Sequence, residues 1–138
     1  ALKTNLRAAI IDFYDEGFRF FISGMAEGFD LFAAEIVLEL KSELEGIALV
    51  AMLPYSEAPK RHSLRTVKRM ENVLSKADAV ISLSEKYFSG CEHRRNIYMV
   101  DNSTGIIGYY NGLSGGTAHC WNYAAEKNLE SVNLYESI

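Results

Sequence analysis

The sequence predicts an α/β fold in which helices cover both faces of a mostly parallel sheet. Apolar residues recur at helical spacing in some segments and form short continuous runs in others, and the two kinds of segment alternate along the chain. The length of 138 residues suits one domain. The chain is 49% hydrophobic and 23% charged with only 2 prolines, which excludes a disordered or low-complexity protein.

The first part of the chain alternates helix, strand, helix and strand. A stripe of apolar residues predicts a helix that starts at the first residues and ends at Gly17. Phe18–Ser23 is a short aromatic and β-branched run, typical of a strand, and a glycine-containing loop then leads to a helix over about Asp30–Glu45. The continuous apolar run Ile47–Leu53, which Pro54 ends, predicts a strand that is buried on both faces.

The rest of the chain continues this alternation. The remaining elements are expected, in order, as a helix at Arg61–Lys76, a strand at Ala79–Leu83, a helix at Cys91–Val100, a strand at Gly105–Tyr110, a helix around Thr117–Ala125 and a strand at Val132–Tyr135. Strict alternation predicts a parallel sheet, with about five strands visible. Because no strand precedes the first helix, we expect residues 1–138 to form a single domain that is truncated at the N-terminus and lacks its first strand.

Charge and cysteine content restrict the function classes. The chain has 14 Lys and Arg residues against 18 Asp and Glu residues, and the net charge of −4 disfavours a protein held to nucleic acid by its overall charge. Cys91 and Cys120 are too few for a disulfide framework and lack the paired spacing of a zinc site, so we expect no metal and a reducing, cytoplasmic setting. Charged residues interrupt every apolar run, so we expect no membrane partner.

A basic segment leaves two interpretations open. Arg61, Arg65, Lys68 and Arg69 are predicted to share one face of the third helix. Such a face suits an anionic partner or nucleic acid, but a solvated helix face has the same pattern. No aromatic residues interleave with the basic ones, so the sequence favours the solvated face.

The loop after the first predicted strand is a candidate ligand site. Ligands of open parallel sheets bind at the carboxyl ends of the strands, where helix N-termini offer free N–H groups. After Ser23, the residues Gly24 and Gly28 allow the backbone to approach a phosphate, and Asp30 would cap the next helix or bind a ribose hydroxyl. An ordinary turn between strand and helix explains the same residues, because the spacing matches neither the dinucleotide fingerprint nor the P-loop.

A second glycine-rich loop precedes the last predicted helix. Ser114, Gly115, Gly116 and Thr117 offer consecutive N–H groups that suit an anion. A plain turn has the same composition, so spacing by itself does not decide between the two interpretations.

Two kinds of side chain complete the candidate site. Arg95, near the start of the fourth predicted helix, would bind a phosphate through its forked guanidinium, with a solvated arginine as the alternative. Tyr55, Tyr87 and Phe88 fall on loops at the same edge of the sheet and would stack on a base, or else pack those loops together.

These motifs together resemble the SLOG superfamily of Rossmann-like proteins. The residues concerned are Ser23-Gly24-x-x-x-Gly28-x-Asp30 with the aliphatic helix that follows, Arg95-Asn96-x-x-Met99-Val100-Asp101, and Ser114-Gly115-Gly116-Thr117. The superfamily joins the DNA-processing Smf/DprA proteins with the Lonely Guy phosphoribohydrolases, and the sequence is most similar to its YpsA-like branch of uncharacterised bacterial proteins. The resemblance implies a Rossmann-like three-layer sandwich with a ligand site at these residues.

Comparison within the superfamily favours binding over catalysis. The phosphoribohydrolases carry Arg-Lys-x-x-Met and Pro-Gly-Gly-x-Gly-Thr-x-Glu segments, but here Asn96 stands in place of the Lys, and the Glu is replaced around Cys120 and Trp121. The resemblance therefore implies a nucleotide-like ligand, such as NAD or an ADP-ribose-like molecule, with Asn96 in its site. Hydrolysis of a nucleotide N-glycosidic bond is one alternative, and an interaction module in DNA processing or cell division is another. Related folds often form homodimers through helices, which makes a homodimer a further expectation.

Overall fold

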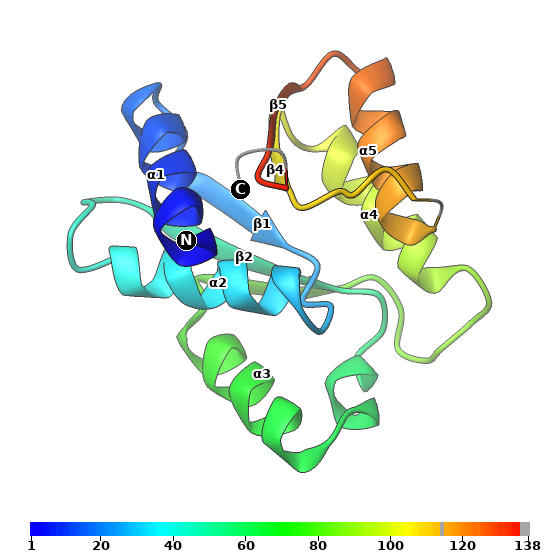
Figure 1. The fold of residues 1–138 in the computed structure, drawn as a ribbon. Coiled ribbons are helices and arrows are strands. Elements are labelled where there is room, and N and C mark those ends of the chain that lie inside the picture. The colour runs from blue at the N-terminus through cyan, green and yellow to red at the C-terminus, as the bar shows by residue number, and fades with distance from the viewer. Residues whose placement is uncertain (114, 136–138) are drawn as a thin grey trace.

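The computed structural model describes residues 1–113 and 115–135, in which helices and strands alternate (Figure 1). The elements are α1 (Leu2–Asp15), β1 (Phe20–Ser23), α2 (Phe29–Leu40), β2 (Ala48–Leu53), the short 3-10 helix η1 (Ala58–Arg61), α3 (Leu64–Lys76), β3 (Ala79–Ser82), α4 (Cys91–Asp101), β4 (Gly105–Gly108), α5 (Gly116–Glu126) and β5 (Glu130–Asn133). Every strand pair among them is parallel, so the predicted α/β class is confirmed.

Within the described residues the strands form two parallel sheets, whereas the sequence predicted one. The first sheet has the order β1-β2-β3, with Phe20 opposite Ala48. The second sheet contains β4 and β5, with Gly105 opposite Glu130. Aromatic side chains pack against the start of β4: a Cβ atom at Gly105 would lie 2.8 Å from the ring of Phe13 and 3.1 Å from the ring of Phe18, the residue two positions before β1. A side chain at position 105 would therefore clash with these rings.

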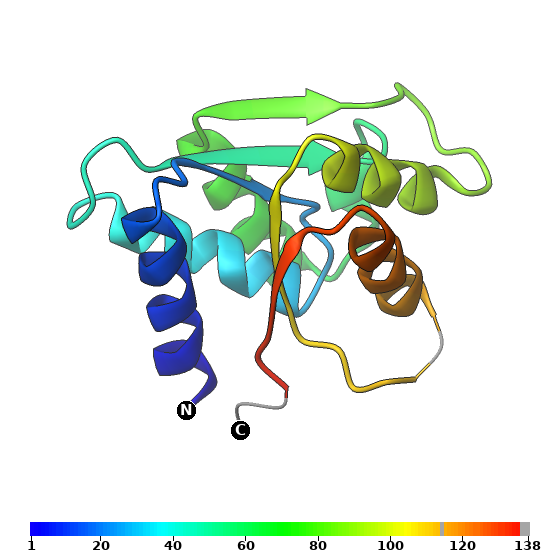
Figure 2. The same ribbon diagram turned by 90° about the horizontal axis from the view of Figure 1, so that it is seen from above.

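The helices lie on two sides of the strands and give the three layers of a Rossmann-like fold. α1, α2 and α3 lie together on one side, and α4 and α5 form a pair on the other (Figure 1, Figure 2). The apolar stripe of α2 buries Leu31, Ile36 and Leu40, and Leu6 and Ile10 of α1 belong to the same core cluster. Spacing of three to four residues places the apolar side chains of each helix on its inner face.

The third helix begins later than its apolar pattern predicted. Ser63 is the N-cap of α3, and its Oγ accepts a hydrogen bond from the backbone N–H of Thr66 at 3.4 Å. Arg61 lies outside α3, at the end of η1, so the prediction of one basic helix face that includes Arg61 is wrong. Leu64 has helical spacing with Val67, which predicts a buried side chain, but it is 71% exposed. The cap, rather than the periodicity, determines where the helix starts.

Two other boundaries differ from the predictions. α2 ends at Leu40 rather than near Glu45, and Ser42 Oγ donates to the backbone O of Glu39 at 3.1 Å, a local bond that competes with helical hydrogen bonding. β5 starts earlier than predicted, at Glu130, because its backbone pairs there with the start of β4. Pairing partners and local side-chain bonds therefore shift element ends that hydrophobic periodicity cannot place.

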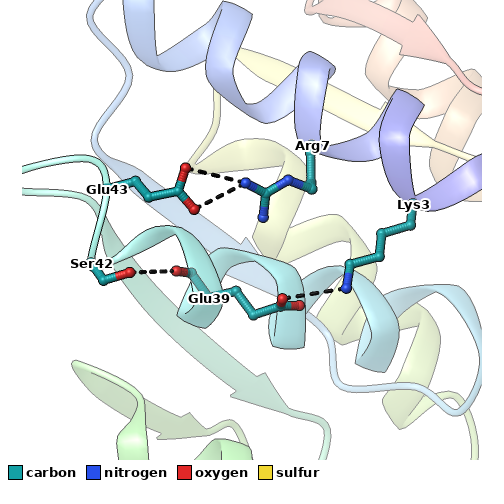
Figure 3. A network of polar contacts seen from close by, with 5 residues as sticks. All are labelled: Lys3, Arg7, Glu39, Ser42 and Glu43. Carbon is teal, nitrogen blue, oxygen red and sulfur yellow. Dashed lines mark hydrogen bonds and ion pairs between the residues drawn. The ribbon is translucent and has the colours of Figure 1, made fainter.

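Ion pairs on the outer surface connect α1 to the end of α2 (Figure 3). Arg7 Nη2 donates to both carboxylate oxygens of Glu43 at 3.2 and 3.0 Å, and Lys3 Nζ lies 3.3 Å from Glu39 Oε1. Partly or fully exposed pairs of this kind contribute about 0.5 kcal/mol each. The buried stripes therefore position the two helices, and the ion pairs contribute little to that arrangement.

Asp78, just before β3, connects the end of α2 to the start of β2. Lys41 Nζ donates to Asp78 Oδ1 at 2.7 Å, and the backbone N–H of Leu49 donates to Asp78 Oδ2 at 2.8 Å. Both hydrogen bonds lower the pKa of Asp78 below its ordinary value, and the bond from Lys41 has the larger effect. The ionised carboxylate is therefore the form that holds these segments together.

We expect Asp78→Ala to lower the free energy of unfolding by about 1 kcal/mol at about pH 7, because it removes charge-assisted hydrogen bonds at a partly exposed site. A carboxyl group whose pKa is lowered by folding stabilises the protein above its unfolded-state pKa, and this contribution is lost as the pH falls through the lowered value. Urea unfolding should therefore show a smaller difference between wild type and variant at about pH 3. An equal difference at both pH values would contradict this assignment.

Candidate functional site

A cavity of about 610 Å³ lies between β1 and β4, with walls from α1, α2, α4 and α5. Its volume falls within the range of about 300–1,000 Å³ that is typical of small-molecule sites. Most of the lining is apolar. One group of polar residues lies where β1 and β4 end, and another, Asn102, Ser103 and Thr104, lies just before β4. We call the region where β1 and β4 end the polar end; its residues are Ser23, Gly24, Glu27, Asp30, Glu92, Arg95, Asn96, Gly116, Thr117 and Cys120.

Ser23 shapes the loop that forms one wall of the polar end. Its Oγ accepts a hydrogen bond from the backbone N–H of Met25 at 3.1 Å and donates to the backbone O of Asp30 at 3.0 Å. Ser23 is buried, and Met25 has a φ of 60°, in the left-handed region. The hydroxyl therefore connects the end of β1 to the first turn of α2 and fixes the path of the loop between them.

Arg95 is a buried cation at the centre of the site. Its Nη1 donates to the backbone O of Gly24 at 2.8 Å, and its Nε donates to Asn96 Oδ1 at 3.1 Å. A Cβ atom at position 24 would lie 2.9 Å from Arg95 Nε and 3.1 Å from Met99 Cε. Gly24 is therefore needed here because the guanidinium packs directly against its backbone, whereas the sequence pattern assigned it to phosphate contact.

Asp30 lies in the first turn of α2 and lines the cavity without capping the helix. The N-cap is Gly28, with a φ of 96°, and no side chain caps this helix, so the predicted capping role of Asp30 is wrong. Burial raises the pKa of Asp30, and the charge of Arg95 partly opposes this rise. Burial also raises the pKa of Cys120, and the negative charge of Asp30 raises it by a smaller amount. Asp30, Arg95 and Cys120 therefore form one electrostatically linked group.

The start of α5 forms the opposite wall of the polar end. Gly115 is its N-cap, with a φ of 136°, and no side chain caps the helix. The N–H of His119 makes the first helical hydrogen bond, to the backbone O of Gly115 at 3.1 Å. The N–H groups of Gly116 and Thr117 come before this bond and therefore have no partner within the helix. Gly116 and Thr117 line the cavity, while Gly115 and Gly28 lie just outside its lining. The predicted site residue Ser114 lies outside the described residues.

Tyr55 lines a second cavity, of about 320 Å³, that shares Gly24 and Arg95 with the first. Tyr55 is only 5% exposed; its hydroxyl accepts a hydrogen bond from Arg61 Nη1 at 3.1 Å, and its ring meets Tyr87 edge-on at 5.6 Å. Tyr55 therefore lines the same cavity as Arg95, and its ring packs against Tyr87 of the neighbouring loop.

Two residues at this edge, Glu92 and His62, were missed by the sequence patterns. Glu92 lines both cavities from the first turn of α4, and its spacing of three residues from Arg95 on a helix could have revealed it. Glu27 accepts a hydrogen bond from Thr66 Oγ1 at 2.9 Å, and His62 Nδ1 lies 3.7 Å from Glu27 Oε2. No local pattern connects Glu27 with His62, because only folding brings the two loops together.

Among residues 1–113 and 115–135, no group of three or more His, Cys, Asp and Glu side chains is placed to hold a metal ion. Cys91 and Cys120 are free thiols. Arg69 is bound to Glu35 through two hydrogen bonds, of 3.1 and 2.6 Å. None of the helices in the described ranges is both long and apolar enough to cross a bilayer.

The fold and the site define a Rossmann-like α/β protein whose candidate ligand site lies at the carboxyl ends of parallel strands. A family model described as the YspA SLOG family, with the short name YpsA, matches residues 1–137. This chain therefore belongs to the YpsA family of SLOG proteins, which confirms the resemblance seen in its motifs.

Individual relatives agree with this membership. The chain is 32% identical over 141 residues to an uncharacterised SPbeta prophage-derived protein, YoqJ, of Bacillus subtilis, covering 93% of this chain and 82% of the relative. It is 27% identical over 131 residues to UPF0398 proteins of Halalkalibacterium halodurans and of Bacillus subtilis, the latter named YpsA. Both alignments cover 94% of this chain, and 69% and 73% of the respective relatives.

Proposed function

We propose that this protein binds a nucleotide or a nucleotide-derived ligand, such as NAD or an ADP-ribose-like molecule, at the polar end of the cavity. One observation carries the proposal: the buried guanidinium of Arg95 shares a cavity with the starts of α2 and α5, whose N-caps Gly28 and Gly115 leave the first turns without a side-chain cap. A phosphate there would meet a fixed positive charge and the positive ends of two helix dipoles.

Backbone and guanidinium groups would bind the phosphates. The loop from Ser23 to Gly28 and the segment from Gly115 to Thr117, with Ser114 before it, would each bind one phosphate through N–H groups. Within the described residues, Nη1 and Nε of Arg95 bond to Gly24 and Asn96, which leaves Nη2 for a phosphate oxygen. Asn96 would thus orient the arginine.

The nucleoside part of the ligand would lie between the two cavities. Asp30 lines the first cavity, and its carboxyl group would bind a ribose hydroxyl. The second cavity adjoins Arg95 and would accommodate a base beside Tyr55 and His62. Because the Tyr55 ring is buried, its face is not free to stack on a base, and we assign it a contact with the edge of the base instead.

Calorimetric titration with AMP, ADP, NAD and ADP-ribose tests the proposal. We expect at least one of them to bind, and Arg95→Lys to weaken that binding about tenfold, because lysine keeps the charge but loses the planar fork. The matched control is Arg94→Lys: Arg94 is exposed and lies over the Phe88 ring, 5.7 Å from its centroid, away from both cavity linings. It should leave binding unchanged.

Two outcomes would overturn the assignment. The first is that none of the four ligands binds the wild-type protein. The second is that Arg94→Lys and Arg95→Lys weaken binding equally, because the loss would then not depend on the position of Arg95 in the cavity.

A second candidate is hydrolysis of a nucleotide N-glycosidic bond. The observation that favours it is Asp30, a cavity carboxyl with a raised pKa, which is a property of many general acids. Release of free base from a nucleoside monophosphate, lost in Asp30→Asn, would identify this activity. Binding of the nucleotide without release of base would leave the binding function alone.

A further inference from the structure

Two exposed histidines lie side by side on neighbouring helices. His93 is in the first turn of α4, and His119 is in the first turn of α5. Their ring centres are 5.6 Å apart, and the ring planes meet at 80°. Neither residue belongs to the lining of the two cavities. The pair is therefore a separate feature of the molecule, which the nucleotide site does not use.

The packing of α4 against α5 brings the two histidines together (Figure 1). The helices run in the same direction, because their starts meet at the histidines and the end of α4 meets a later part of α5. At that end Tyr123 Oη donates to Asp101 Oδ1 at 2.6 Å, and Lys127 Nζ lies 4.0 Å from the same oxygen. No local pattern connects His93 with His119, because they belong to different helices.

The separation of the rings is close to that of two imidazoles bound to one metal ion. Histidine nitrogens bind zinc at about 2.0 Å in a tetrahedral arrangement, which places the centres of two bound rings about 5 Å apart. The ion sets no angle between the ring planes, so the observed 80° is compatible with it. Both side chains are exposed, so rotation about their torsions can direct one nitrogen of each ring at a shared ion.

We propose that His93 and His119 together bind one divalent transition-metal ion of the kind that prefers imidazole ligands, such as Zn²⁺, and that this ion joins the start of α4 to the start of α5. Within the described residues no third His, Cys, Asp or Glu side chain is placed to join them, so water would take the remaining positions. The ion would restrain the helices that carry Arg95, which follows His93, and Thr117, which precedes His119.

The surroundings of the pair favour Zn²⁺ over Mg²⁺ and Ca²⁺. The positive ends of the α4 and α5 dipoles lie at the pair and disfavour a purely ionic contact with a cation. Mg²⁺ and Ca²⁺ bind mainly through oxygen ligands, whereas zinc forms bonds to imidazole nitrogens. Binding at this site therefore depends on nitrogen–metal bonds, and the two oxygen-preferring ions should not compete for it.

Calorimetric titration of the whole chain with Zn²⁺ tests the proposal. We expect one ion per chain, and His93→Ala and His119→Ala should each weaken binding at least about tenfold, because both imidazoles hold the same ion. The matched control is His62→Ala. His62 is the remaining histidine of the sequence and lies beside Glu27, so its removal should leave Zn²⁺ binding unchanged.

Urea unfolding provides a second readout. An ion that binds only the folded chain should raise the midpoint of the wild type and of His62→Ala, but not that of His93→Ala or His119→Ala. Replacement of exposed histidines should not prevent folding. The proposal would be overturned if Zn²⁺ did not bind or if Mg²⁺ displaced it. Binding that survives either His93→Ala or His119→Ala, or an equal loss in His62→Ala, would also overturn it.

Discussion

Replacing Gly24 by alanine is expected to lower the free energy of unfolding by about 2 kcal/mol, the usual cost of adding a methyl group to a packed interior. The new Cβ would lie 2.9 Å from Arg95 Nε and 3.1 Å from both Arg95 Cζ and Met99 Cε. The arginine cannot withdraw easily, because it is buried and hydrogen-bonded to the backbone of Gly24 itself. Urea unfolding measures the loss, and weaker binding of any ligand identified by calorimetry should accompany it.

Gly116→Ala is the matched control for this substitution. Gly116 is the first residue of α5, and no atom lies within 4 Å of the position that its Cβ would take. We expect an unchanged free energy of unfolding, or a gain of up to about 1 kcal/mol, because alanine favours the helix. If the two variants had equal stability, the contact between Gly24 and Arg95 would not be the reason for glycine at position 24.

Arg95→Met is expected to lower the free energy of unfolding by about 3 kcal/mol near pH 7. The substitution removes the donor to the buried backbone O of Gly24 and the cation that opposes the raised pKa of Asp30. Loss of the donor leaves the buried backbone O of Gly24 without this hydrogen bond, and the carboxyl group of Asp30 loses the positive charge of Arg95 in the same cavity. Methionine keeps much of the side-chain volume, so the loss reports on polar contacts rather than on a void.

The pH dependence of this loss identifies its cause. Burial holds the pKa of Asp30 above its ordinary value, and removal of Arg95 should raise it further. A carboxyl group whose pKa is raised by folding does not destabilise the folded protein below its unfolded-state pKa. The destabilisation grows as the pH rises from the unfolded-state pKa toward the folded-state pKa. The deficit of Arg95→Met should therefore be smaller near pH 4 than near pH 7.

The double variant Arg95→Met with Asp30→Asn completes the cycle. It should recover part of the stability lost at about pH 7, because it removes the carboxylate that lacks the positive charge of Arg95 in the single variant. The same deficit at both pH values, together with no recovery in the double variant, would show that Arg95 does not balance the charge of Asp30.

Hydrophobic periodicity was sufficient to predict the order and type of the helices and strands. The stripe that contains Leu31 and Leu40 and the apolar run of β2 are signals within single segments, and both produced elements close to the predicted ones. The start of α3 was predicted too early, because the hydrogen bond from the N–H of Thr66 to Ser63 fixes the start of the helix, and the apolar pattern contains no signal for this cap. Caps and pairing partners act at element ends, where periodicity carries no information.

The candidate site was predictable in composition and only partly in geometry. Glycines and polar residues at the ends of predicted strands placed Ser23, Gly24 and Arg95 at one edge, and the structure brings them together. Their contacts could not be predicted: Gly24 accommodates the arginine, and the hydroxyl of Ser23 is used within its own loop. Such contacts join residues far apart in the sequence and depend on how helices cross the sheet.

The amino-acid sequence was sufficient for the α/β class, the alternation of elements and the family, because each depends on patterns or motifs within local segments. Only the tertiary structure decided that the strands form two sheets, that Arg95 and Asp30 share a cavity, and that Gly24 packs against Arg95. The physical reason is that burial and pairing are properties of distant segments in contact. A local pattern can favour a strand, but it cannot choose the neighbour of that strand.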